Sequence, residues 1–142
     1  MTIRQISVFL ENKAGHLNKI LAVLAQNNIN INALTVADSS DYGLLRMLVS
    51  DPEKAVEILR SENFPVRIHE VISLEMSAAP GSMSQIIDLF FSAGLSIKYV
   101  YAFSFGSKSV LVLRTNDREK AFEVITANQL KSIHESDLKI TK

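Results

Sequence analysis

The second half of the chain repeats the first half, and this repeat limits the folds that the chain can adopt. A gap-free shift of 66 positions pairs Gly15 with Gly81 and places segment 51–57 on segment 117–123, where five of seven residues are identical. The tripeptide Ile68-His69-Glu70 resembles Ile133-His134-Glu135 at a shift of 65, which predicts a one-residue deletion before the last strand. The sequence therefore predicts one structural unit that occurs twice in tandem.

Hydrophobic periodicity predicts the order strand, helix, strand, strand, helix, strand in each copy. In the first copy, apolar residues alternate along the strand 6–10 and then follow helical spacing at Leu17, Ile20, Leu21 and Leu24. Met83, Ile86, Ile87 and Phe90 repeat that spacing in the second copy. A second helix is expected at Asp51-Pro52, since Asp is a good helix cap and Pro suits the first helical position. The remaining strands are expected at 31–36, 44–49, 66–69, 71–74, 97–103, 110–113 and 133–135.

This order predicts an α+β protein with two tandem ferredoxin-like βαββαβ units, spanning residues 1–69 and 70–142. In each unit, an antiparallel sheet would pack both helices on one face. The expected last strand of the first copy runs directly into the first strand of the second copy, which leaves almost no linker. Because this fold hosts enzymes, carriers and RNA-binding modules, it does not by itself define a function.

Composition excludes several classes of function. The 142 residues include 15 basic and 15 acidic residues, and no stretch concentrates lysine or arginine, so nucleic acid is not the expected partner. The chain has no cysteine, which excludes disulfides and thiolate chemistry. It also lacks the roughly 20 consecutive apolar residues of a membrane span. We therefore expect a cytoplasmic protein without a cofactor.

Both copies place a glycine where the first helix begins. Gly15 and Gly81 close the turns 11–17 and 77–83. The first N–H groups of a helix, at the positive end of its dipole, favour an anion such as a carboxylate. The alternative is that each glycine only allows a tight turn. Recurrence in both copies makes the two interpretations about equal in weight.

The segment Glu11-Asn12-Lys13-Ala14-Gly15-His16-Leu17, followed by Asn30-Ile31, resembles the ACT domain, and the resemblance extends over both copies. It implies a non-enzymatic, allosteric regulatory module that binds a small amino acid at the seam between two ACT units. The contacts implied in the first copy are Asn12, Ala14, Gly15, His16, Leu17 and Asn30. Pro80 and Gly81 are their counterparts in the second copy, where Ala78 and Ser96 replace the two asparagines and leave a second site in doubt.

The sequence also predicts what the chain associates with. The exposed edges and the uncovered face of each sheet predict a homodimer. Since no catalytic domain is expected within these 142 residues, a regulatory output would act on an enzyme in another chain. The alternative functions are a protein-interaction subunit with a vestigial pocket and, less favoured, an RNA-binding module.

The other candidate residues are given simpler interpretations. His16, His69 and His134 are too scattered in sequence for a metal site, so no metal is predicted. Asp38 and Asp41 could form an acid/base pair, but they lie in a turn without a nucleophile between them. The alternating row of Tyr99, Tyr101, Phe103 and Phe105 could stack RNA bases, but with only Lys98 and Lys108 nearby it favours a contact between domains or chains.

Overall fold

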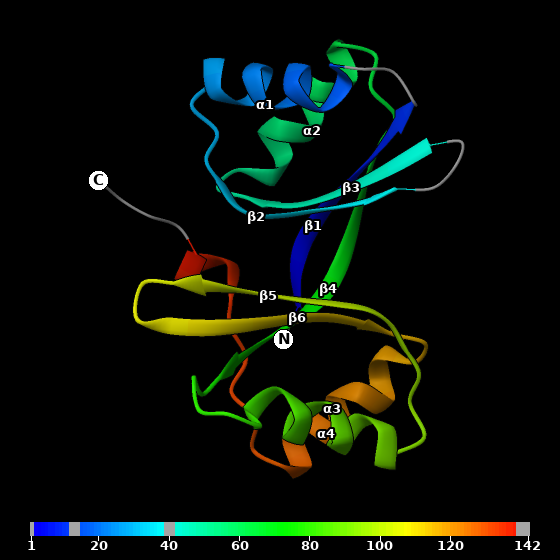
Figure 1. Cartoon of the computed structure of the whole chain (residues 1–142), viewed down its shortest axis with the longest axis vertical. Coiled ribbons are helices and arrows are strands. Elements are labelled where there is room, and N and C mark those ends of the chain that lie inside the picture. Colours follow the sequence, from blue (N-terminus) through cyan, green and yellow to red (C-terminus); the bar gives the residue numbers. More distant parts are fainter. Residues whose placement is uncertain (1, 12–14, 39–41, 139–142) are drawn as a thin grey trace. The chain divides into compact units, whose positions relative to one another are not determined.

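The computed structural model describes residues 2–11, 15–38 and 42–138, which fall into two compact units. One unit, the first-copy unit, contains residues 4–70. The other, the second-copy unit, contains residues 71–138 together with residues 2 and 3. Each unit is built mainly from one sequence repeat and has its own pair of helices (Figure 1).

The first-copy unit has the strand order β2-β3-β1-β4. Strand β3 pairs antiparallel with both β1 and β2. Its elements are β1 (Thr2–Glu11), α1 (His16–Gln26), β2 (Ile31–Asp38), β3 (Tyr42–Val49), α2 (Pro52–Ser61) and the first part of β4 (Val66–Met76). This is the predicted ferredoxin-like arrangement.

The second-copy unit repeats this plan with the strand order β4-β6-β5. Strand β6 pairs antiparallel with both β4 and β5. Its elements are the second part of β4, α3 (Ser82–Ser92), β5 (Ile97–Phe105), β6 (Lys108–Thr115), α4 (Arg118–Ala127) and a 3-10 helix, η1 (Glu135–Leu138). The α+β class and the tandem ferredoxin-like fold are thus confirmed.

Each unit buries one face of its sheet under its two helices. Because successive side chains of a strand point to opposite faces, every second residue of the central strands enters this core. In the first copy the core includes Ile6, Val8, Ile20, Leu24, Leu45, Met47, Ala55 and Leu59. The equivalent core of the second copy includes Ile72, Leu74, Ile86, Phe90, Leu111, Leu113, Ala121 and Ile125. Fully burying one such large apolar side chain contributes about 1.5–3 kcal/mol.

The last strand of the second copy differs from its prediction. Instead of a strand at 133–135, a single bridge joins Ser132 to Leu74, and the chain then enters η1. The Asp137 carboxylate accepts a hydrogen bond from the backbone N–H of His134 at 2.9 Å, and the backbone N–H of Asp137 donates to the His134 carbonyl. These bonds turn the chain away from the sheet, because they occupy backbone groups that a strand would need for pairing.

Within residues 2–11, 15–38 and 42–138, no helix has both the length and the hydropathy needed to cross a membrane.

Candidate functional site

Helices α1 and α3 begin in the same unusual way. Each follows a glycine in the left-handed conformation, with φ of 92° at Gly15 and 85° at Gly81. The glycine carbonyls accept the first helical hydrogen bonds, from Lys19 N at 2.9 Å and from Gln85 N at 3.0 Å. No described side chain caps either helix, and neither helix has an acidic residue in its first turn.

The other two helices provide an internal contrast. At the start of α2, the Asp51 carboxylate accepts a hydrogen bond from Lys54 N at 3.2 Å. At the start of α4, the Asp117 carboxylate does the same for Lys120 N at 3.1 Å. Both helices also carry an acidic residue in the first turn. Their positive ends are therefore already neutralised, whereas no described side chain neutralises those of α1 and α3.

The space beside the two glycines is open. A Cβ added to Gly15 or Gly81 would meet no described atom within 4 Å. Steric crowding therefore does not require glycine here, but the positive φ does, because L-residues with a side chain are strained in that region. Pro80 is exposed in the turn before Gly81, where Ser77 Oγ accepts a hydrogen bond from Ala79 N at 3.0 Å.

His16 is the first residue of α1, next to Gly15. Its ring packs edge-on against Phe64, with centroids 5.9 Å apart, and Lys19 Nζ lies 5.7 Å from the same Phe64 ring. The buried His16 Nδ1 has no hydrogen-bond partner among the residues that the structure describes. A neutral imidazole can donate or accept through this atom, so its hydrogen-bonding capacity is unused among the described residues. Leu17 packs partly buried against the core and presents no polar group.

Asn30 lies at the opposite end of α1, which ends at Gln26. Its side-chain Nδ2 donates to Asn32 Oδ1 at 3.4 Å, and its backbone N–H donates to Ser50 Oγ at 3.0 Å. An 11-residue helix is about 16 Å long, so one amino acid cannot contact both Gly15 and Asn30 of the same unit. The two ends of α1 can be followed in Figure 1.

The second copy makes the Asn30–Ser50 contact with the two residue types exchanged. Ser96 occupies the position of Asn30, and its backbone N–H donates to Asn116 Oδ1 at 2.9 Å. Asn116 N in turn donates to the Ser96 carbonyl at 3.1 Å, as Ser50 N does to Asn30 at 2.9 Å. Comparing the sequences of the two copies did not identify Ser50 and Asn116, because asparagine and serine exchange places between the copies and this hides the shared contact. The common separation of 20 residues was the available signal.

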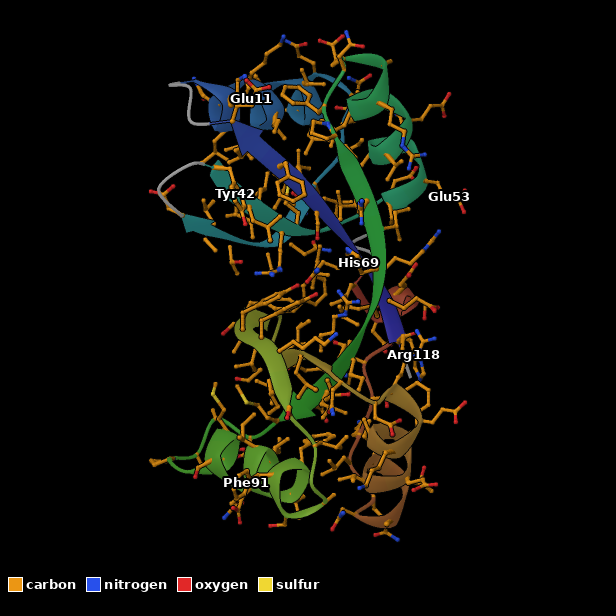
Figure 2. All side chains as sticks on the ribbon, turned by 90° about the vertical axis from the view of Figure 1, so that its right-hand side faces the viewer. Glu11, Tyr42, Glu53, His69, Phe91 and Arg118 are labelled. Atoms are coloured by element: carbon orange, nitrogen blue, oxygen red, sulfur yellow. The ribbon has the colours of Figure 1, made fainter. Side chains whose placement is uncertain are left out.

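The remaining predicted residues are distributed over the fold. Asn12, Ala14 and Asp41 lie outside the described residues, and Asp38 ends β2. Across residues 2–11, 15–38 and 42–138, no three histidine, aspartate or glutamate side chains gather in a way that could hold a metal ion. Figure 2 labels His69 on β4, well separated in sequence from His16 and His134.

The aromatic row of β5 lies on the sheet face away from α3 and α4. Tyr101 is opposite Val112 and Phe103 is opposite Val110, whereas the intervening Leu111 belongs to the core beneath the helices. All four aromatic side chains of the row are half-buried.

The chain thus consists of two ferredoxin-like units in tandem, and the first helix of each unit follows a left-handed glycine. A family model described as "ACT domain pair" matches residues 1–141. The chain therefore belongs to the ACT domain pair family, as the sequence resemblance predicts.

Known proteins resemble the chain over different lengths. The crystal structure of protein BT0572 from Bacteroides thetaiotaomicron has a TM-score of 0.91 and 35% identity, covering 99% of this chain and 98% of that one. The ligand-free regulatory subunit of aspartate kinase from Thermus thermophilus has a TM-score of 0.61 and 14% identity, with coverage of 89% and 91%. This second likeness shows the fold alone.

Among curated sequences, the acetolactate synthase isozyme 3 small subunit of Escherichia coli is 36% identical over 61 residues, which is 42% of this chain. The chain spans about half or less of the length of the curated relatives that it matches, between 37% and 51%.

Proposed function

We propose that this chain is a non-enzymatic regulatory module that binds a free small amino acid between two ACT units. The observation that carries the proposal is the pair of uncapped helix starts at Gly15 and Gly81, beside the capped starts of α2 and α4. A carboxylate at α1 or α3 would accept hydrogen bonds from backbone N–H groups of the first helical turn and interact with the positive end of the helix dipole. In α3 the first of these groups, Ser82 N–H, already donates to the Ala79 carbonyl at 3.2 Å.

The ammonium group of the ligand needs acceptors some distance from the carboxylate. In the first copy, Asn30 supplies an amide oxygen, but it lies about one helix length from Gly15. A ligand that contacts both kinds of group must therefore take them from two different units. This separation supports a site at a seam between ACT units rather than within one of them.

Names of related proteins support a regulatory role. The Escherichia coli and Buchnera aphidicola relatives are both, by name, small subunits of acetolactate synthase. We infer that this chain acts in the same manner, on an enzyme carried by another chain and in the cytoplasm. Homodimerisation is part of the proposal, because ligand at a seam can then shift how the units associate.

The RNA-binding alternative receives less support from the structure. Lys108, which is opposite Phe105, lies 3.4 Å from Glu75 and is ion-paired, and the other basic residue directly opposite the row is Arg114, across from Tyr99. The aromatic side chains themselves are half-buried, so their faces are not fully available to bases. The subunit with a vestigial pocket remains as the second proposal, and ligand binding distinguishes the two.

A thermal-shift screen of the twenty amino acids, followed by calorimetric titration, tests the proposal. A ligand that binds only the folded state raises its melting temperature. Absence of any shift or heat at millimolar concentration would favour the vestigial pocket and contradict the amino-acid site.

A matched pair of variants then tests the location of the site. Gly81→Asp places a carboxylate at the start of α3, where it competes with the ligand, while Gly81→Asn has nearly the same shape without the charge. We expect binding at α3 to fall at least about tenfold further for the Asp variant than for the Asn variant. The same pair at Gly15 tests α1. Equal affinities for Asp and Asn variants at both positions would place the ligand elsewhere.

A further inference from the structure

Among the described residues, the second-copy unit takes three strands from its own repeat, namely β4, β6 and β5. The place of a fourth strand lies beside β4, and the chain begins to fill it. Ser132 forms a bridge with Leu74, and Ile133 N donates to the Ser73 carbonyl at 2.9 Å. The pairing then stops, and the chain enters η1. The last segment of this repeat therefore leaves part of the β4 edge uncovered.

One tripeptide occurs twice in the chain and has two conformations. Ile68-His69-Glu70 is part of the strand β4, whereas Ile133-His134-Glu135 lies outside any strand and its last residue begins η1. Because the residues are identical, their own preference for strand or helix is not enough to explain the difference. The availability of a pairing edge must contribute to it.

The first residues of β1 belong to the second-copy unit. Thr2 and Ile3 group with residues 71–138, whereas β1 from residue 4 onward groups with the first-copy unit. The pairing of β1 with β3 begins at Ile6, and the other neighbour of β1 in the sheet is β4. Strands β1 and β4 can be followed side by side in Figures 1 and 2. The start of β1 therefore pairs with β4.

The register of this pairing follows from a hydrogen bond at its other end. Phe9 N donates to the Pro65 carbonyl at 3.3 Å. Hydrogen-bonded pairs recur every two residues in antiparallel strands, so the same register places Ile3 opposite Val71. Both side chains are 1% exposed, which agrees with a closely packed pair. The start of β1 thus covers the edge of β4 at Val71.

The segment after Ser132 would need the same edge. Its bond from Ile133 N to the Ser73 carbonyl belongs to an antiparallel register. One further step of two residues along that register would place Glu135 opposite Val71. Val71 has one backbone N–H and one carbonyl, which serve one neighbour on that side. Residues 2–3 and residues 134–135 therefore cannot both pair there.

We propose that these two segments form a strand-exchange switch, in which residues 2–3 and residues 134–135 compete for the edge of β4 at Val71. In the described state residues 2–3 hold the edge, and the Asp137 carboxylate holds the diverted chain by accepting from His134 N at 2.9 Å. In the alternative state residues 2–3 leave, segment 133–135 continues as a strand along β4, and η1 unwinds.

The switch links the first described residues of the chain to its last ones. An uncovered strand edge is a template for another strand, so the edge of β4 does not stay empty when residues 2–3 withdraw. A protein that binds the extended start of β1 would therefore change the conformation of residues 133–138, and the linkage acts equally in the other direction. This inference does not depend on amino-acid binding.

Amide hydrogen exchange of the full chain, followed by NMR, tests the exchange. Ile3→Asp places a carboxylate at a buried position, so residues 2–3 should leave β4. Glu135 N–H should then exchange at least about tenfold more slowly, because it gains a bond to β4. Asp137 N–H should exchange faster, because its bond to the His134 carbonyl is lost. Absence of slowing at Glu135 would overturn the proposal.

Phe9→Asp is the matched control for this variant. It makes the same substitution on the same strand and the same sheet face, since residues 3 and 9 are separated by an even number of positions. Phe9 lies at the other end of β1 and is 45% exposed. The exchange of Glu135 and Asp137 should therefore stay at the parent rate.

The reverse test introduces no buried charge. Asp137→Ala removes the hydrogen bond that holds the diverted chain, so Ile3 N–H should exchange at least about tenfold faster while Val8 N–H keeps its rate. Adding Glu135→Pro should restore slow exchange at Ile3. Proline lacks the N–H that the new strand needs, but it suits the first position of a helix. An unchanged Ile3 rate in Asp137→Ala, or fast exchange that persists in the double variant, would overturn the proposal even if Ile3→Asp does not fold.

Discussion

The carboxylate of Glu75 lies 3.4 Å from the ammonium of Lys108, on the sheet face that points away from α3 and α4. In the first copy the equivalent positions hold Phe9 and Tyr42, whose ring centroids are 5.3 Å apart. The repeat therefore preserves a side-chain contact on this face while it replaces an aromatic pair by an ion pair. Lys131 Nζ also lies 3.4 Å from Glu75, so the carboxylate has two cationic neighbours.

Glu75→Gln should weaken the second-copy unit by about 0.5–1 kcal/mol, because its side chain is only 26% exposed and it loses two ion pairs. The loss should shrink as salt is added, since salt screens these charges. Urea denaturation at low and high salt measures both effects. The control is Glu57→Gln, an exposed glutamate of α2 beyond its first turn, which should change the stability little. Equal losses for the two variants would contradict this prediction.

Asp51→Ala and Asp117→Ala should each cost about 1 kcal/mol of unfolding free energy. Each carboxylate accepts a hydrogen bond from the third residue beyond it and neutralises the start of its helix. Asp88→Ala, at an exposed position inside α3, is the control and should be nearly neutral. Chemical denaturation of the three variants measures these losses of unfolding free energy. A loss at Asp88 as large as at the caps would refute the capping argument.

The sequence was most informative where a pattern extends over many residues. The helical spacing at Leu17 to Leu24, repeated at Met83 to Phe90, is a property of the chain itself and predicted α1 and α3. The missing strand after Ser132 depends instead on one carboxylate, that of Asp137, which accepts from His134 N and competes with strand pairing. Such local competition leaves no periodic signal in a sequence.

The candidate site was predictable only in part. The sequence motif predicted that Gly15 and Gly81 lie at the starts of two helices, and the structure places both of them there. It also grouped Asn30 with Gly15, although α1 separates the two by its full length. Proximity within a motif does not give proximity in space when a helix lies between. The packing of His16 against Phe64, and its Nδ1 without a partner among the described residues, could not be predicted from residue types.

Gly81→Ala should destabilise the chain by about 1–2 kcal/mol through backbone strain alone. The glycine has φ of 85°, and no described atom lies within 4 Å of an added Cβ, so the cost contains no steric overlap. Gly81→Asn should cost less, because asparagine tolerates this conformation, as Asn28 and Asn63 do in this chain. Melting temperatures of the two variants give the comparison. A more stable Ala than Asn variant would contradict the assignment of strain to φ.

The final prediction concerns the difference between the copies. If the Asn30 amide holds a charged end of the ligand, Asn30→Ala removes a charge-assisted hydrogen bond worth about 1.5–3 kcal/mol. Affinity should then fall about tenfold to a hundredfold, while the melting temperature of the free protein changes little. The melting temperature should change little because the contact with Ser50 uses the backbone N–H of residue 30, which alanine retains.

Ser96→Ala is the matched control in the second copy. Its backbone N–H would still donate to Asn116 Oδ1, and the short serine hydroxyl that it loses cannot bridge two groups of a ligand. We therefore expect little change in binding by calorimetric titration. If Ser96→Ala weakens binding and Asn30→Ala does not, the working site belongs to the second copy. If neither substitution changes the affinity for an amino acid that does bind, the asparagine contact is wrong, and the backbone beside Gly15 or Gly81 must hold the ligand.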